Sequence, residues 1–220
     1  MTISHHPGED LLLDYVSGSL AETWSIAVAA HLALCPICRR TVSELEAVGG
    51  ELMSAVAPVP VEEDLYKSIV AATNAVHEDS VPSRPVTDSS GPNPILPEPL
   101  RSYLGGDVGS LEWRRLGLGA YQLPIPTGDE QTTARLLRIP AGRPVPTHSH
   151  GGLELTLVLS GAFSDVTGTY SRGDLQEADE NIDHQPHAAP GEDCICLAVT
   201  DAPLRFKSLA ARMVQPLIGI

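Results

Sequence analysis

Aromatic and basic residues are scarce in this sequence. Aromatic side chains make up 4% of the 220 residues, and 14 lysines and arginines stand against 28 aspartates and glutamates, for a net charge of −14. Because an acidic surface repels nucleic-acid phosphates, we do not expect direct binding to DNA or RNA. Such a surface suits a basic protein partner, for example one that itself binds DNA, and it also favours solubility.

Long hydrophobic stretches are missing as well. The apolar runs are interrupted within about a dozen residues, which is too short to cross a bilayer. The opening MTISHHPGEDLLLDY has no basic segment followed by an apolar one, so no secretory signal is predicted. We therefore expect a cytoplasmic protein that does not associate with a membrane. In that reducing compartment the four cysteines are expected to be free thiols or metal ligands rather than disulfides.

The first part of the chain has the pattern of a helical domain. Its acidic residues exceed its basic ones by nine, so most of the negative charge lies here. Pro36 suits the first turn of a helix, whereas Gly49 and Gly50 could interrupt or end one. Apolar residues recur at helical spacing in four segments, which are residues 8–20, 21–34, 36–56 and 62–76.

A proline-rich stretch separates this part from a part with a different sequence pattern. Residues 80–100, SVPSRPVTDSSGPNPILPEPL, contain six prolines and no periodicity, which predicts a linker. After it, short apolar runs alternate with glycine, proline and aspartate turns, as is typical of an antiparallel β sandwich or barrel. We predict an all-α domain over residues 1–79 and an all-β domain over residues 101–220.

A metal-site pattern lies in the second half, in GRPVPTHSHGGLELTLVLSG. His148 and His150 are two residues apart and project from the same face of a strand. Glu154 follows a Gly-Gly turn that can bring it back beside them, and such a donor set suits a divalent first-row metal. The spacing G-x5-H-x-H-x3-E-x6-G matches the first cupin motif at every fixed position. Residues 100–220 therefore resemble a cupin, a double-sheet β barrel.

Cupins usually supply one more histidine from a second motif, from which this sequence departs. The proline and glycine in the middle of that motif and its final asparagine are missing. His184 and His187 are both candidates for the remaining ligand. We favour His184, because it lies about where the strand of the second motif should begin, whereas a lone His187 is more often a solvated loop residue.

A second metal-site pattern lies in HLALCPICRR, in the first half. His31 and Cys35 share a helix face, and Cys38 follows a proline-containing turn, so that both sulfurs can reach one ion. Tetrahedral zinc requires a fourth ligand. The alternatives are two buried helix thiols or a redox pair, although the redox motif is expected in a βαβ setting, which is absent here. The other histidines of this half are His5, His6 and His77.

The combination of an H-x3-C-x2-C helical domain with a cupin resembles the ChrR family of zinc-binding anti-sigma factors. The resemblance extends over the full length and includes MTISHH, HLALCPICRR, GGLELTLVLSGAF and DCICLAVTDAPLRF. It implies that the helical domain holds zinc and sequesters an extracytoplasmic-function sigma factor of the RpoE type in a one-to-one complex. It also implies a cupin that holds a second zinc and is required for the response to singlet oxygen and related stress.

The resemblance also implies two sets of zinc ligands. The first set is His6, His31, Cys35 and Cys38, with His5 as a neighbouring alternative to His6. The second set is His148, His150, Glu154 and His184, which would suit iron or manganese as well as zinc.

An enzyme is the alternative interpretation. Three histidines and a glutamate are also the ligands of cupin dioxygenases and isomerases, in which an open coordination position performs the chemistry. No general base beside these ligands is evident in the sequence, so we expect no catalysis. A DNA-binding regulator is disfavoured by the acidic balance. Cys194 and Cys196 alternate on a predicted strand and face the same side, which indicates core packing more than a redox role.

Overall fold

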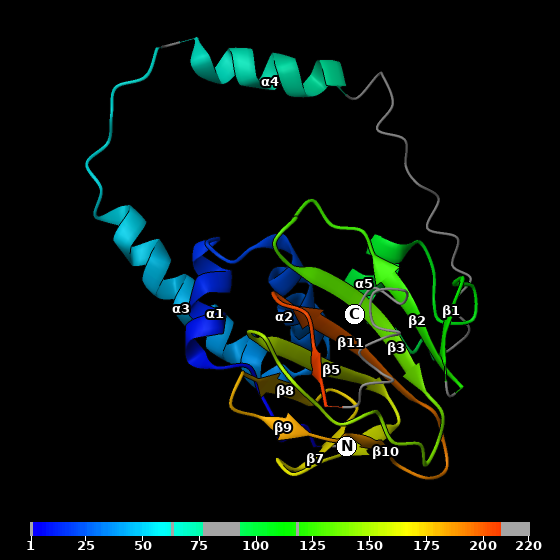
Figure 1. Ribbon diagram of the computed structural model, residues 1–220. Coiled ribbons are helices and arrows are strands. Elements are labelled where there is room, and N and C mark those ends of the chain that lie inside the picture. The colour runs from blue at the N-terminus through cyan, green and yellow to red at the C-terminus, as the bar shows by residue number, and fades with distance from the viewer. Residues whose placement is uncertain (1, 63, 77–92, 118, 208–220) are drawn as a thin grey trace.

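The structure is a computed structural model that describes residues 2–62, 64–76, 93–117 and 119–207 (Figure 1). Helices make up the N-terminal half and strands the C-terminal half, which confirms the predicted fold class. Among the described residues, no single helix is long and apolar enough to cross a membrane; α2 and α3 would qualify by length and composition only as a pair bent by 116°. The helices are α1 (Glu9–Ser17), α2 (Glu22–Leu34), α3 (Pro36–Ser54), α4 (Leu65–Val76) and α5 (Glu98–Leu104).

Local sequence signals explain where α1 and α2 end and where α3 begins. α1 stops at Gly18, which adopts a left-handed conformation (φ 72°) that glycine accepts without steric cost. α2 stops at Cys35, which is extended (φ −101°, ψ 107°), and Pro36 then occupies the first turn of α3. The sharp bend at Cys35 therefore follows from the proline after it. Gly49 and Gly50 do not end or interrupt α3, which continues through both.

The strands form one large sheet and two small ones, with antiparallel pairing throughout. The large sheet has the order β1-β2-β3-β11-β5-β8, and the small sheets have the orders β10-β6-β7 and β12-β4-β9. The strands are β1 (Arg114–Gly117), β2 (Ala120–Ile125), β3 (Thr133–Ile139), β4 (His148–Ser149), β5 (Glu154–Ser160), β6 (Ala162–Ser164), β7 (Thr169–Ser171), β8 (Leu175–Ala178), β9 (Asp183–His184), β10 (His187–Ala188), β11 (Cys194–Thr200) and β12 (Arg205–Phe206).

One hydrophobic core joins the helices to the large sheet. β5 is buried on both faces: its Leu155, Leu157 and Leu159 belong to a cluster with residues of α2, while Val158 belongs to another cluster on the barrel side. α2 packs against α1, α3 and α5 as well as the sheet, so it is buried nearly all round. The α2 residues in the shared core are Trp24, Ile26, Ala27 and Ala30. The helical and β halves are therefore packed together.

The C-terminal end of the predicted linker is packed rather than extended, which corrects part of that prediction. Leu96 and Leu100 are fully buried, and α5 begins at Glu98. Pro97 is the N-cap and Pro99 lies in the first turn, two positions where proline does not disrupt a helix. The proline content therefore placed the end of the predicted linker too far along the chain. Residues 80–92 lie outside the described residues, and the domain boundary itself stays a prediction.

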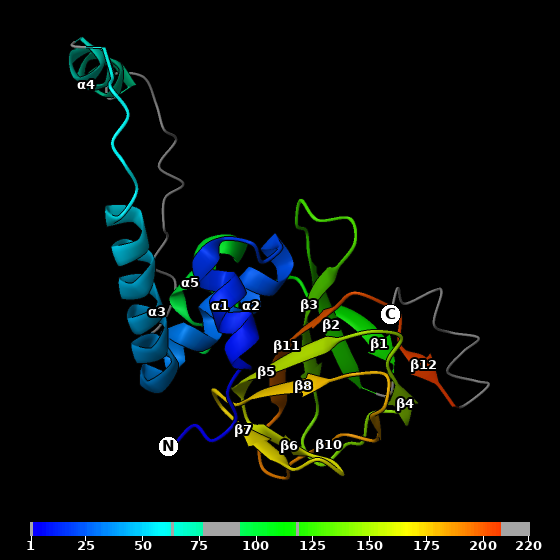
Figure 2. The same cartoon turned by 90° about the vertical axis from the view of Figure 1, so that its left-hand side faces the viewer.

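The end of α3, the following segment and α4 form an exposed arm. All of residues 51–62 and 64–74 are exposed, and α4 stands apart from the body of the molecule in both views (Figures 1 and 2). The arm nevertheless carries large apolar side chains; Leu52 is 68% exposed and Ile69 53%. We refer to residues 51–62 and 64–76 as the arm.

Candidate metal centres

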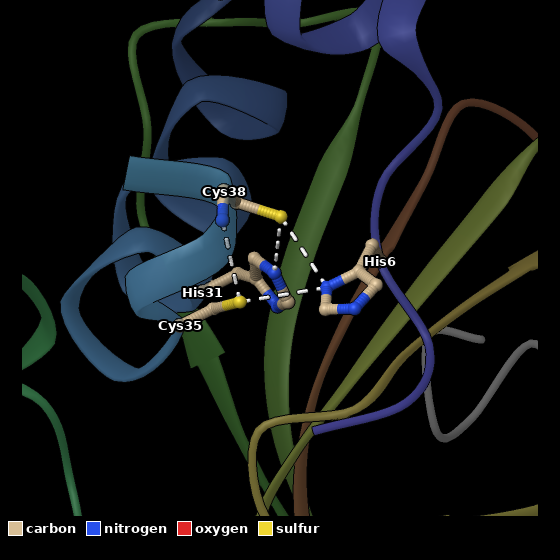
Figure 3. Close-up of side chains that lie close together, drawn as sticks. All are labelled: His6, His31, Cys35 and Cys38. Atoms are coloured by element: carbon tan, nitrogen blue, oxygen red, sulfur yellow. Dashed lines mark hydrogen bonds between the residues drawn. The ribbon is translucent and has the colours of Figure 1, made fainter. Parts of the chain in front are cut away.

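Four side chains of the N-terminal half meet at one point, as Figure 3 shows. Nδ1 of His6 lies 3.4 Å from Sγ of Cys35 and 3.3 Å from Sγ of Cys38, and Nε2 of His31 lies 3.3 Å from Sγ of Cys38. The ligand atoms around a tetrahedral zinc ion lie about 3.3–3.8 Å apart, as follows from the usual zinc–sulfur and zinc–nitrogen bond lengths. The four residues are therefore placed as a zinc site would need them.

The chain positions this N-terminal cluster by local means. His31 lies in the last turn of α2, and Cys35 caps α3, because its sulfur accepts a hydrogen bond from the Cys38 N–H at 3.5 Å. Arg39 donates to the carbonyls of Leu32 and Ala33, two of the groups left unpaired where α2 ends. The bend between the helices thus turns both sulfurs toward His31.

The structure separates the candidate histidines for the fourth position. His6 belongs to the cluster, whereas the ring of His5 lies 4.4 Å from that of Tyr170 and its Nδ1 is 3.5 Å from the carboxylate of Asp174. His77, the third candidate, lies outside the described residues.

The electrostatics of this cluster favour neutral groups when no ion is bound. Burial lowers the pKa of His31 to about 4, although a hydrogen bond to the Gly173 carbonyl opposes the shift. Burial also raises the pKa of Cys38 to about 12, and the hydrogen bond and charge of Cys35 act in the same direction. The thiolate, not the thiol, binds metal, so an ion must displace a proton from Cys38.

A second cluster consists of three buried histidines of the barrel. Nε2 of His184 lies 3.0 Å from Nε2 of His148 and 3.1 Å from Nε2 of His150. His148 on β4 and His184 on β9 are direct cross-strand partners, so the ladder itself sets their separation. Burial lowers the pKa of His148 and of His150 to about 4, which keeps both rings neutral at neutral pH.

The outer hydrogen bonds of these rings fix the direction of their lone pairs. Nδ1 of His148 donates to the Pro146 carbonyl at 2.8 Å, and Nδ1 of His184 donates to Oδ2 of Asp165 at 2.6 Å. Neither acceptor can donate a proton, so when both rings are neutral their Nε2 atoms present lone pairs to each other 3.0 Å apart. Two lone pairs at that distance repel unless a cation lies between them. The barrel cluster is therefore suited to a metal ion.

The two remaining candidates of the barrel lie outside this cluster. Oε2 of Glu154 is 3.6 Å from Nδ1 of His150, too far for a hydrogen bond, and no hydrogen-bond partner for that nitrogen is found among the described residues. Burial raises the pKa of Glu154 to about 7, although a hydrogen bond from Thr156 opposes the shift. His187 is exposed and donates to the Gln185 carbonyl. The structure gathers three histidines, with Glu154 beside them.

Comparison with known proteins identifies the family. The chain is 46% identical over 220 residues, covering all of both chains, to the anti-sigma-E factor ChrR of Cereibacter sphaeroides. The chain belongs to the ChrR family of anti-sigma factors. Residues 104–203 match the ChrR cupin-like domain. The crystal structure of Rhodobacter sphaeroides SigE in complex with the anti-sigma ChrR superposes with a TM-score of 0.78 at 44% identity, covering 91% of this chain and 100% of that one.

Membership of the ChrR family confirms the resemblance found in the sequence, and with it the helical and cupin architecture. A match over the whole length to an anti-sigma factor also supports a regulator rather than an enzyme.

A cavity of about 80 Å³ adjoins the barrel cluster of this ChrR-family chain. His148, Glu154 and His184 line it together with Cys194 and Cys196 of β11. Both cysteines are buried free thiols, and the pKa of Cys196 is raised well above its usual value by a hydrogen bond to Cys194 and by burial. The prediction that the two thiols face one side agrees with their position on the cavity wall.

Sequence reasoning missed the residues that hold the ligands in place. Asp165 orients His184, and the Gly173 carbonyl orients His31. Both clusters thus depend on residues 165–174. Residues 169–179, TYSRGDLQEAD, include Gly173 but carry only the signal of a turn, because the partner of Gly173 lies far away along the chain.

Proposed function

We propose that this chain sequesters an extracytoplasmic-function sigma factor of the RpoE type in a one-to-one complex, in the cytoplasm. The full-length match to an anti-sigma-E factor is the observation that carries the proposal. It is supported by the related crystal structure, in which ChrR is in complex with SigE. The partner of this chain would be the corresponding sigma factor of its own cell.

Zinc at the N-terminal cluster would fix the shape of the capturing domain. His6 lies near the chain start, His31 at the end of α2, and the two cysteines at the start of α3. One ion bound to all of them would tie these three segments together, and the free energy of metal binding would add to the stability of the fold. The direction in which α3 and the arm leave the body would then depend on the ion.

The arm has the chemistry of a docking surface for a sigma factor. Its exposed apolar side chains include Leu65 and Ile69, and acidic residues such as Glu51, Glu62 and Asp64 lie among them. The surfaces with which a sigma factor contacts DNA and polymerase are rich in basic residues, so an acidic rim favours association. Burial of the apolar side chains would supply the affinity.

Zinc is the metal we propose for both clusters. Two thiolates and two imidazoles form a common closed site for structural zinc. In the barrel, His148, His150, Glu154 and His184 would be the ligands; a metal there supplies a positive charge between the histidine lone pairs. Asp165 and the Pro146 carbonyl hold two of those rings in the required tautomer.

The cupin half would release the sigma factor under oxidative stress, for which singlet oxygen is the proposed signal. A change at the barrel cluster or at the thiols of its cavity would lower the affinity of the helical half for the sigma factor.

The proposed function is tested by mixing the purified chain with its cognate sigma factor. We expect a one-to-one complex by size-exclusion chromatography with light scattering, and inhibition of sigma-dependent transcription in vitro. If no complex forms and transcription proceeds, the proposal is wrong.

A further inference from the structure

One turn of the barrel contacts the N-terminal metal cluster directly. Nδ1 of His31 donates to the Gly173 carbonyl at 2.9 Å, which leaves Nε2 facing Cys38. Gly173 has a φ of 93°, and a Cβ at this position would lie 2.5 Å from Cδ1 of Ile3. A side chain would thus be strained by the backbone and would clash with the N-terminal segment. Glycine lets this carbonyl reach the ligand.

Asp174, the next residue, holds the segment that precedes His6. Its carboxylate is almost fully buried, with 1% of the residue exposed. Oδ1 accepts hydrogen bonds from the N–H groups of Ser4 at 2.8 Å and His5 at 2.9 Å. Oδ2 accepts hydrogen bonds from the N–H and hydroxyl of Ser171, at 2.8 and 2.9 Å. Both oxygens are needed as acceptors, one for the N-terminal segment and one for the turn.

β8 anchors the same segment on both sides of His6. The Leu175 N–H donates to the His5 carbonyl at 3.2 Å, and the Gly8 N–H donates to Oε1 of Glu177 at 2.7 Å. Because β8 is the last strand of its sheet, the N-terminal segment covers a sheet edge that would otherwise be open. His6 therefore extends toward the thiols from a backbone that the barrel holds on both sides.

We propose that Gly173 and Asp174 are positioning residues of the N-terminal metal site, so that the barrel sets how tightly the helical half holds its ion. The proposal rests on the metal site of the proposed function. Two of the four candidate ligands, His31 and His6, are oriented by this turn of the cupin half. Loss of such outer partners typically weakens metal binding by about 10–100-fold.

The same strand also connects the turn to the barrel cluster. Nε2 of Gln176 donates to Oδ2 of Asp165 at 2.8 Å, and that oxygen also accepts from His184. A movement of His184 would therefore act on β8, and through β8 on the segment that carries His6. This gives the cupin half a physical route to the metal site that shapes the capturing domain.

Asp174→Asn in the full chain tests the proposal. The amide must place an NH2 group against one of the two sets of donors, so either the N-terminal segment or the turn is released. The probe is cobalt(II), because the thiolate-to-metal charge-transfer band arises from the site with Cys35 and Cys38. Asp193→Asn is the matched control, since that carboxylate also holds a barrel turn but its partners are Arg138 and Ala141, both in the barrel.

We expect Asp174→Asn to lose cobalt to a competing chelator at a concentration about 10–100-fold lower than the unmodified chain, and Asp193→Asn to behave as the unmodified chain. Cobalt at the barrel cluster does not contribute to the charge-transfer band, so it is measured as the total bound cobalt minus the cobalt that gives the band. This amount should be unchanged in both variants. Equal retention by Asp174→Asn overturns the proposal, as does an equal loss in Asp193→Asn.

A second pair of variants applies if Asp174→Asn does not fold. Ser4→Pro removes an N–H donor from the N-terminal side, with Thr2→Pro as its control, and a loss of cobalt confined to Ser4→Pro supports the proposal. Equal retention by the two overturns it. Sigma-factor binding does not enter these measurements. A variant that loses cobalt and still binds the sigma factor tightly supports the positioning role, and would contradict the zinc-dependent capture described above.

Discussion

His148 and His184 illustrate how single residues prepare a cation site. The Nδ1–H of each ring donates a hydrogen bond to a fixed acceptor, a carbonyl or a carboxylate, so the Nε2 lone pair of the neutral ring points inward. The N-terminal cluster works differently, because Cys38 retains its proton until an ion displaces it. The two sites should therefore differ in where their metal binding depends on pH, because Glu154, with a pKa of about 7, loses its proton between pH 6 and pH 8, whereas Cys38 stays protonated over that range without metal.

The affinity of the N-terminal site for zinc should rise with pH. The pKa of Cys38 is raised to about 12 by burial, so the thiol is protonated in the metal-free chain and binding releases that proton. His31, with a pKa of about 4, is neutral from pH 6 to pH 8 and adds nothing to the slope. We expect affinity to increase at least about tenfold per pH unit over this range. Chelator competition at pH 6, 7 and 8 measures it, and a flat or falling affinity would contradict this account.

The arm is the element whose form is hardest to explain without a partner. An isolated helix as short as α4 is marginal in water, yet it exposes Leu65 at 43% and Ile69 at 53%. Apolar side chains gathered on an exposed helix are typical of a surface that another protein covers, which agrees with the docking role proposed for the arm.

Changing that face should weaken capture and leave the fold intact. Leu65→Asp combined with Ile69→Asp places two charges in the proposed interface, and we expect the sigma complex to weaken at least tenfold, or about 1.4 kcal/mol. Asn74→Asp, on the opposite side of the same helix, is the control and should have little effect. The thermal midpoint should not change in either variant, because these side chains are exposed. Titration calorimetry with the sigma factor measures the affinity of each variant. Undiminished binding by the double variant would show that α4 is not part of the interface.

Elements that depend on local signals could be predicted from the sequence. The helix expected at 21–34 begins one residue later, and the helix expected at 36–56 begins at Pro36 and ends two residues earlier, because periodicity and proline are local signals. The spacing of His31, Cys35 and Cys38 gave three members of a cluster for the same reason. α5 was missed because its prolines resembled a linker, although at the start of a helix they are tolerated.

Contacts between distant segments could not be predicted. His31 and Gly173 are 142 residues apart, and Asp174 and Ser4 are 170 apart. The choice between His5 and His6 depends on this docking of the N-terminal segment, which no local pattern encodes. The preference for His184 over His187 had a basis in the motif, but the role of Asp165 became visible only in the folded barrel.

At the scale of the whole molecule, the two halves form one packed body with a projecting arm (Figure 2). Trp24 of α2 lies in the core with the leucines of β5, and the N-terminal segment lies along β8. A change in the cupin half would therefore have a short mechanical path to the helices, while the arm remains available for a partner.

A chain that ends at Pro85 should still bind the sigma factor and should no longer respond to stress. Removal of the barrel exposes the α2 residues of the shared core and deletes Gly173 and Asp174, so we also expect a lower thermal midpoint and easier loss of zinc. Reporter transcription with and without a singlet-oxygen source, compared with the full chain, measures the response. Full responsiveness of the shortened chain would exclude the cupin half from sensing.

The central claim is that an ion at the N-terminal cluster shapes the domain that captures a sigma factor. It is tested most directly by the affinity for the cognate sigma factor of three preparations: the zinc-loaded chain, the same chain after removal of metal, and the Cys35→Ser, Cys38→Ser double variant. We predict that the zinc-loaded chain binds at least about 100-fold more tightly than the other two, a difference of roughly 2.7 kcal/mol. Equal affinity in all three would contradict the account.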